Sequence, residues 1–211
     1  MTKKSYYHII LDQSGSMQDC IDQTISGFNE QLQVLRSLHE RYPDQEILAG
    51  LTRFNNEVMH TYSGQNPFSI EKLDDNLYVP DGTTALYDAI GESVLRIRDK
   101  IGAELKEGIA SVVVIILTDG YENASTVFTA AGISKLIKQL EQTGKWTFSY
   151  LGATIDAVEI ARGMNIRAEN SLSFHKDNIS EIYCEISESI NRKEELRSKG
   201  ITSTEFLKRR K

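Results

Sequence analysis

The stretch YYHIILDQSGSM, residues 6–17, passes from an almost entirely apolar run into a turn that contains an acid, two serines and a glycine. Short runs of apolar, β-prone residues are typical of central strands that are covered on both faces of a sheet. A second run of this kind, SVVVIIL at 111–117, leads directly into TDG at 118–120. The sequence therefore predicts two buried strands, one ending at Asp12 and the other near Asp119.

Strand-like runs alternate along the chain with segments that have the apolar spacing of amphipathic helices. Strands are expected at 6–11, 47–54, 58–62, 111–117, 146–153 and 170–174, and helices at 21–35, 86–101, 126–143, 156–164 and 177–197. This alternation predicts an α/β fold of the doubly wound, Rossmann-like type, with a mostly parallel central sheet and helices on both faces. The strand at 58–62 follows a short turn and is expected to be one antiparallel edge strand.

The chain of 211 residues is 40% hydrophobic, which suits one domain with a single sizeable core. We expect this domain to occupy residues 1–200 and to be followed by a flexible basic tail, residues 201–211, that ends in KRRK. Of the polar and aromatic residues, His8 and Trp146 lie in predicted strands and are expected in the core. The two cysteines, Cys20 and Cys184, are widely separated, so we expect small buried or half-buried thiols.

The composition excludes several classes of partner. The net charge of -6 argues against a general nucleic-acid binder. The longest apolar run, VVVIIL at 112–117, is far too short to span a bilayer, so no membrane partner is expected. The first residues read as a strand and not as a signal peptide, which predicts a cytoplasmic protein. We infer no oligomeric state from the sequence.

The aspartates at the ends of the two buried strands indicate a metal site. In an open α/β sheet, ligands bind beyond the carboxyl ends of the strands, near the point where the strand order reverses. If the two strands are neighbours, Asp12 and Asp119 lie together, and desolvating both is costly unless a cation lies between them. Ser14 and Ser16 follow Asp12 at gaps of two residues and place their hydroxyls on the same side of the turn.

A third hydroxyl comes from the loop before the predicted helix at 86–101, where Thr83 and Thr84 stand side by side. Two carboxylates and three hydroxyls form an all-oxygen set without His or Cys. Hard cations prefer such a set, so we expect Mg²⁺ or Mn²⁺, with Ca²⁺ as an alternative, and not zinc. Because hydroxyls are weak neutral ligands, the metal would stay electrophilic and would accept a further anion.

Three motifs resemble those of von Willebrand factor type A (vWA) domains. DQSGSM at 12–17 fits the D-x-S-x-S signature, GTTALYDAI at 82–90 resembles the threonine element, and LTDG at 117–120 fits the second acidic element. Together they resemble a complete metal-ion-dependent adhesion site (MIDAS), and the resemblance spans nearly the whole chain. It implies metal-shell residues at Asp12, Ser14, Ser16, Thr84 and Asp119, with Thr84 favoured over Thr83 because it directly precedes the small residue Ala85.

The resemblance also implies how the protein works. In related domains a partner's Asp or Glu completes the metal shell, which predicts a metal-dependent protein–protein interaction module and not an enzyme. Solitary members of this type resemble subunits of intracellular multi-protein systems. Tyr121, Glu122 and Asn123 follow the second acidic element, and they are expected either to rim the site or to form a plain polar loop.

Other readings of the opening turn are weaker but stay open. A nucleotide-binding loop would need GxGxxG or GxxxxGK[ST], and the chain contains neither. A Mg²⁺-dependent phosphohydrolase with an aspartyl nucleophile would normally carry a second acid two residues after Asp12, where this chain has Ser14. A scaffold protein with a non-functional metal site is the remaining alternative.

Overall fold

A computed structural model describes residues 3–207 of the chain. Its strands are β1 (Lys3–Asp12), β2 (Gln45–Phe54), β3 (Val58–Gln65), β4 (Ala110–Thr118), β5 (Trp146–Gly152) and β6 (Ser171–Ser173). Its α-helices are α1 (Ile21–Arg41), α2 (Leu86–Glu107), α3 (Ala130–Glu141), α4 (Ala157–Gly163) and α5 (Ile179–Ser198). Every predicted strand and helix is present, with ends that differ by a few residues.

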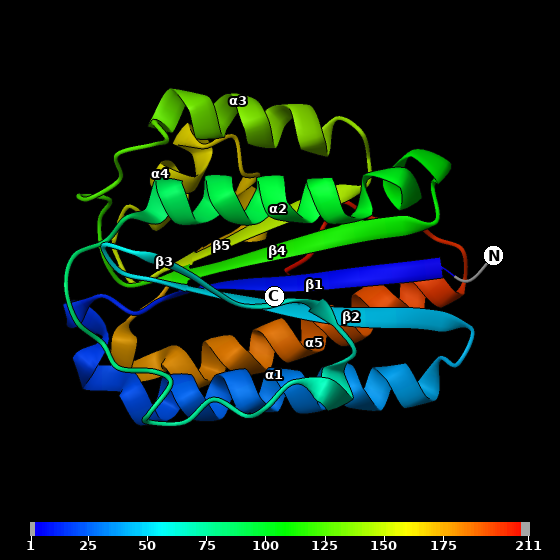
Figure 1. Ribbon diagram of the computed structural model, residues 1–211, viewed down its shortest axis with the longest axis horizontal. Coiled ribbons are helices and arrows are strands. Elements are labelled where there is room, and N and C mark those ends of the chain that lie inside the picture. The colour runs from blue at the N-terminus through cyan, green and yellow to red at the C-terminus, as the bar shows by residue number, and fades with distance from the viewer. Residues whose placement is uncertain (1–2, 208–211) are drawn as a thin grey trace.

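The strands form one six-stranded sheet in the order β3-β2-β1-β4-β5-β6. β3 pairs with β2 in the antiparallel direction, and all the other pairs are parallel (Figure 1). The predicted fold class is therefore confirmed. From β1 the chain first builds outward through β2 and β3 and then returns to build β4 on the other side, so the strand order reverses between β1 and β4. Such a switch point leaves a crevice at the carboxyl ends of the two strands.

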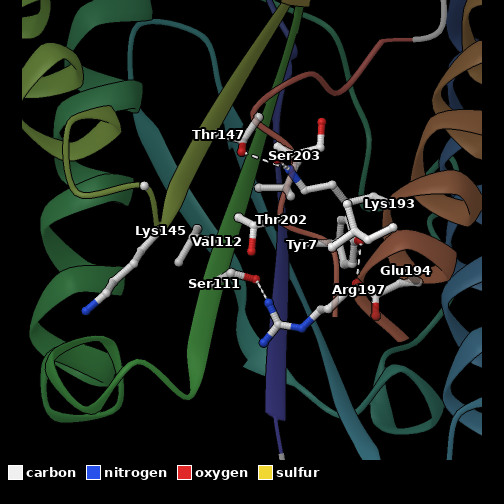
Figure 2. A pocket seen from close by; sticks show the side chains of 13 residues that line it. Tyr7, Ser111, Val112, Lys145, Thr147, Lys193, Glu194, Arg197, Thr202 and Ser203 are labelled. Atoms are coloured by element: carbon white, nitrogen blue, oxygen red, sulfur yellow. Dashed lines mark hydrogen bonds between the residues drawn. The ribbon is translucent and has the colours of Figure 1, made fainter. Parts of the chain in front are cut away.

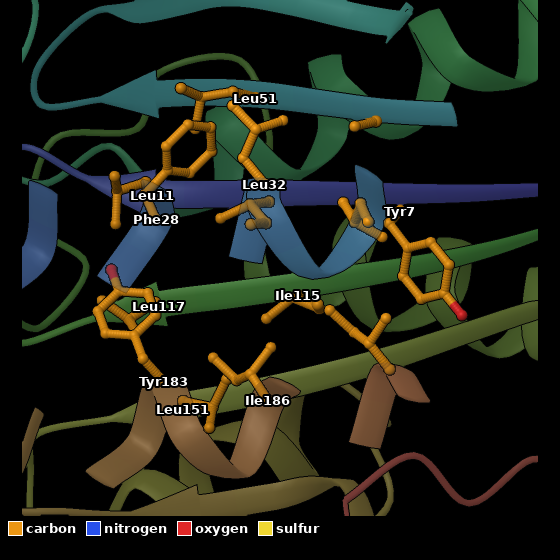
Figure 3. Close-up of a cluster of buried hydrophobic side chains, with 14 of the residues drawn as sticks. Tyr7, Leu11, Phe28, Leu32, Leu51, Ile115, Leu117, Leu151, Tyr183 and Ile186 are labelled. Carbon is orange, nitrogen blue, oxygen red and sulfur yellow. The ribbon is translucent and has the colours of Figure 1, made fainter. Parts of the chain in front are cut away.

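Helices cover both faces of the sheet: α1 and α5 lie on one side, and α2, α3 and α4 on the other (Figure 1). Side chains of β1 alternate between the two layers, so that Tyr7, Ile9 and Leu11 pack toward α1 and α5 while Tyr6 and Ile10 pack toward α2. Figure 3 shows the cluster on the α1 and α5 side, where Phe28 and Leu32 of α1 meet Tyr183 and Ile186 of α5 over the sheet. Each fully buried large apolar side chain contributes about 1.5–3 kcal/mol, so these two layers hold the central strands in place.

Most of the expected core residues are buried. The side chains of His8 and Trp146 are 3% and 2% exposed, as predicted. His8 Nε2 lies 2.9 Å from the hydroxyl of Thr52, and burial lowers the pKa of His8 to about 3, so this imidazole is neutral at pH 7. Cys20 is buried, but Cys184 is exposed, because it lies on the solvent side of α5; the expectation was wrong for Cys184.

The segment after α5, part of the stretch expected to form a tail, packs against the domain at residues 203–207. Phe206 and Leu207 are 1% and 7% exposed and belong to the core on the α1 and α5 side. Asn170 fixes this segment from both sides, because its amide donates to Thr204 O (2.9 Å) and its Oδ1 accepts from Phe206 N (2.7 Å). The motif KRRK, 208–211, lies outside the described residues.

A small polar pocket lies where this segment, the second half of α5 and the strands meet (Figure 2). Lys193 donates to Thr147 Oγ1 and to Ser203 O, and Arg197 donates to Ser111 Oγ (Figure 2). These bonds tie α5 to β4, to β5 and to the terminal segment. No helix within residues 3–207 is both long and apolar enough to cross a membrane.

The tight contact between α1 and α5 gives a first prediction. A Cβ at Gly27 would lie 2.0 Å from the Tyr183 ring, so Gly27→Ala must push α5 away and should lower the free energy of unfolding by about 1–3 kcal/mol. Gly102→Ala in α2 is the matched control, because a Cβ there meets no atom within 4 Å and should leave stability equal or up to about 1 kcal/mol higher. Urea unfolding of the two variants checks this; equal stabilities would contradict it.

Lys193 gives a second prediction, on pH. Burial lowers the pKa of Lys193 to about 8 from its usual 10.5, so between these values the unfolded chain holds more protons than the folded one. The free energy of unfolding should therefore rise with pH across this window, by an amount on the order of 1 kcal/mol. Lys193→Met removes the titrating group, so the rise should appear as a difference between the wild type and this variant in urea unfolding at pH 8 and pH 10. Parallel pH profiles would contradict it.

Candidate metal centre

Asp12 is the last residue of β1, and both of its carboxylate oxygens accept hydrogen bonds. Its Oδ1 accepts from Ser14 N (2.7 Å), and its Oδ2 accepts from the hydroxyl of Thr118 at the end of β4. Its side chain is fully buried, and its main-chain oxygen accepts from the Tyr78 hydroxyl (2.7 Å). Burial is the main cause that raises the pKa of Asp12; the bonds from Thr118 and Ser14 oppose the rise, and the charge of Asp119 adds to it. A nearby cation would relieve both the burial and the repulsion.

A chain of hydroxyls connects the turn after β1 to the end of β4. Ser14 Oγ and Ser16 Oγ are 3.1 Å apart, and Ser16 Oγ donates to Asp119 Oδ1 (2.7 Å). Ser14 is buried and Ser16 is exposed, so this series of hydrogen-bonded hydroxyls leads from the interior to the surface of the crevice. The two acidic elements that the sequence placed at neighbouring strand ends are thus within direct hydrogen-bonding reach of each other.

Thr84 faces the same space from the loop before α2. A Cβ placed on Gly120 would lie 3.2 Å from Thr84 Oγ1 and 3.6 Å from Ser16 Oγ, so both hydroxyls border the room that this glycine leaves open. Thr84 is 3% exposed, whereas Thr83 is exposed to solvent. The backbone of Thr84 is fixed, because its N–H donates to Asn123 Oδ1 (2.9 Å) and its carbonyl accepts from Asn123 N (3.0 Å).

Two further acids, whose roles the sequence did not predict, hold the loop between β4 and α3 in place. Glu122 accepts from the backbone N–H groups of Tyr87 (2.9 Å), Ala124 (2.9 Å) and Ser125 (2.7 Å). Asp88, in the first turn of α2, accepts from the N–H groups of residues 126–128 at 2.7–3.3 Å. Acidic residues are favoured in the first turn of a helix, so the position of Asp88 could be recognised from the sequence. Its partners, the N–H groups of residues 126–128, could not.

Tyr121, Glu122 and Asn123, which follow the second acidic element, differ in their surroundings. Glu122 and Asn123 brace the loop that carries Thr84, while Tyr121 is 54% exposed and its hydroxyl donates to Asp156 (3.0 Å). Tyr121 therefore stands at the surface, where a bound molecule would meet it.

Lys176 is the residue that sequence reasoning missed altogether. It opens the 3₁₀ turn Lys176–Asn178 between β6 and α5, and its ammonium pairs with Asp119 Oδ2 and donates to Ser16 O (2.7 Å). Lys176 is one lysine in an otherwise unremarkable polar loop, so no spacing or motif marks it.

The donor set fits a hard divalent cation. It offers carboxylates from Asp12 and Asp119 and hydroxyls from Ser14, Ser16 and Thr84, and Asp119 Oδ2 is a buried oxygen whose charge partner is the ammonium of Lys176. Within residues 3–207 there is no cluster of three or more His, Cys, Asp or Glu side chains that could hold a metal, so a metal here depends on the hydroxyls. Such a shell of two acids and neutral oxygens is suited to Mg²⁺ or Mn²⁺ more than to zinc.

Comparison with known proteins shows the fold. No protein family matches the sequence, and no curated protein matches it. Solved structures do match in shape. The vWF domain of the type V pili tip protein from Porphyromonas gingivalis aligns over 91% of this chain and 96% of its own, with 10% identity and a TM-score of 0.63. The chain therefore has the fold of a vWA domain.

Two further matches contain a metal. The manganese-loaded TRAP protein of Plasmodium vivax aligns over 86% of this chain and 72% of its own, with 16% identity and a TM-score of 0.57. Proximal thread matrix protein 1 from the mussel byssus, with a zinc-occupied MIDAS motif, aligns over 88% of this chain, with 14% identity and a TM-score of 0.57. The chain spans only 45% of the length of the mussel protein.

The bracing role of Glu122 gives a prediction that needs no metal. Glu122→Ala removes the acceptor of three N–H groups, so the amides of Tyr87, Ala124 and Ser125 should exchange with solvent about tenfold faster. Glu107→Ala, at the far end of α2, is the control and should leave these rates unchanged. The exchange rates of these amides are measured by NMR. Unchanged rates in Glu122→Ala would show that Glu122 is not needed to hold the loop.

Proposed function

We propose that this chain is a vWA protein that binds a divalent cation, Mg²⁺ or Mn²⁺ with Ca²⁺ as an alternative, through Asp12, Ser14, Ser16, Thr84 and Asp119. The observation that carries the proposal is the hydrogen bond from Ser16 to Asp119, because it joins the turn after β1 to the end of β4 at the switch point of the sheet. The manganese-loaded and zinc-occupied vWA structures support it.

The metal's role would be to receive a carboxylate from another protein. Two acids balance the charge of a divalent ion, and neutral hydroxyls leave it able to accept a further anionic ligand. We expect an Asp or Glu side chain of a partner protein to supply this ligand. The protein would then act as an interaction module, as a subunit of an intracellular, cytoplasmic multi-protein system.

The surface around the centre suits a protein partner. Val79, Tyr121 and Ile155 are 54%, 54% and 96% exposed, and they lie in loops at the same edge of the sheet as Asp12 and Asp119. Gln13 ties the first of these loops to the turn after β1 by donating to Val79 O (2.8 Å). Exposed apolar residues next to a charged centre are typical of interaction sites.

The residues after Asp12 do not favour a catalytic role for it. An aspartyl-nucleophile phosphohydrolase normally carries a second acid two residues after its nucleophile, but here that position is Ser14, whose N–H donates to Asp12 Oδ1. We therefore place Asp12 as an anchor of the metal site, in a protein that is not an enzyme.

The test is metal and partner binding by variants of the five residues. Asp12→Ala should lose Mg²⁺ and Mn²⁺ binding in titration calorimetry and should lose any partner that the wild type releases in chelator. Since Asp12 is buried, Ser16→Ala serves as a second variant that removes an exposed hydroxyl; it should weaken metal binding about tenfold or more with its circular dichroism unchanged.

A matched pair of threonines supplies the control. Thr84→Ala should lose metal affinity, whereas Thr83→Ala, one residue away and exposed, should bind as the wild type does. Absence of divalent-metal binding by the wild type, or partner capture by Asp12→Ala that persists in chelator, would overturn the proposal.

A further inference from the structure

Lys176 places a positive charge inside the proposed metal centre. Its ammonium pairs with Asp119 Oδ2 and donates to Ser16 O (2.7 Å), so it contacts two of the five residues that we assign to the metal. The lysine comes from the turn before α5 and not from any of the three motifs.

The Asp119 carboxylate depends on this contact. One of its oxygens, Oδ1, accepts from Ser16 Oγ (2.7 Å), while Oδ2 is buried. The ammonium of Lys176 is the ion-pair partner of Oδ2. A carboxylate whose side chain is only 2% exposed would be strongly destabilised without a compensating cation.

A divalent ion and the ammonium cannot share this carboxylate at low cost. A metal ion on Asp119 would lie within a few ångströms of Lys176, and like charges at that separation in a partly buried site repel strongly. The side chain of Lys176 is 29% exposed, and its stem is a flexible four-carbon chain, so it can turn into solvent without opening the core.

We propose that Lys176 is a tethered cation: it neutralises Asp119 in the metal-free protein and is displaced when a divalent ion binds. This inference rests on the proposed function. It adds that the ammonium of Lys176 competes with the divalent ion for Asp119. The competition stabilises the metal-free protein and lowers its apparent affinity for the metal, because part of the binding free energy is used to detach the lysine.

The experiment compares Lys176→Met, which keeps the length of the side chain and removes its charge, with Lys176→Arg, which keeps the charge. Lys106→Met, an exposed position at the far end of α2, is the control. Mg²⁺ and Mn²⁺ affinities are measured by titration calorimetry, and the melting temperature is measured in chelator.

Lys176→Met should bind Mg²⁺ about five- to tenfold more tightly than the wild type, the range expected for losing one partly exposed ion pair. In chelator it should melt at a lower temperature, because Asp119 then lacks its cation. Lys176→Arg and Lys106→Met should match the wild type in affinity within about twofold.

The outcomes separate this proposal from the metal site itself. If the wild type and Lys176→Met bind Mg²⁺ equally well, or Lys176→Met binds it more weakly, the tethered cation is refuted and the metal site stands. If no variant binds a divalent ion, the metal site fails and the competition fails with it.

Discussion

The Asp12 carboxylate is the link on which the arrangement of this protein depends. Its two oxygens join the turn after β1 to the end of β4, through Ser14 N and the hydroxyl of Thr118. Because β1 and β4 are the strands between which the sheet order reverses, this buried charge lies at the crevice that the fold itself creates. The apolar layers on both faces fix the strands, and the strands in turn fix the acid.

Around this link the polar residues divide into two groups. One group, made of Asn123, Glu122 and Asp88, satisfies backbone N–H groups and so gives the loops a defined shape. The other group lies at the crevice: Thr84 Oγ1 and Ser16 Oγ border the space beside Gly120, and Asp119 bonds to Ser16 there and pairs with the ammonium of Lys176. Rigid loops favour the binding of a hard cation, because oxygens that are already in position lose little entropy when the ion binds.

The sequence predicted the sheet well, and it indicated that the five oxygen-bearing residues of the proposed metal site gather at one edge, because both follow from local patterns. Apolar runs ending in acids mark central strands, and the spacing of Ser14 and Ser16 from Asp12 is a property of one turn. Lys176 could not be found in this way, because its contact with Asp119 depends on the path of the chain through β5 and β6. Phe206 was missed for a related reason: two apolar residues next to a run of charges resemble a solvated terminus until tertiary packing buries them.

The burial of Phe206 also bears on the synthesis of the chain. The layer between the sheet, α1 and α5 includes residues from β1 at one end of the sequence and Phe206 and Leu207 near the other. Synthesis runs from the N-terminal to the C-terminal side, so Phe206 and Leu207 can join this layer only after β1, α1 and α5 have been made. Until then the apolar surface that these two side chains cover stays exposed, and exposed apolar surface on a nascent domain favours aggregation.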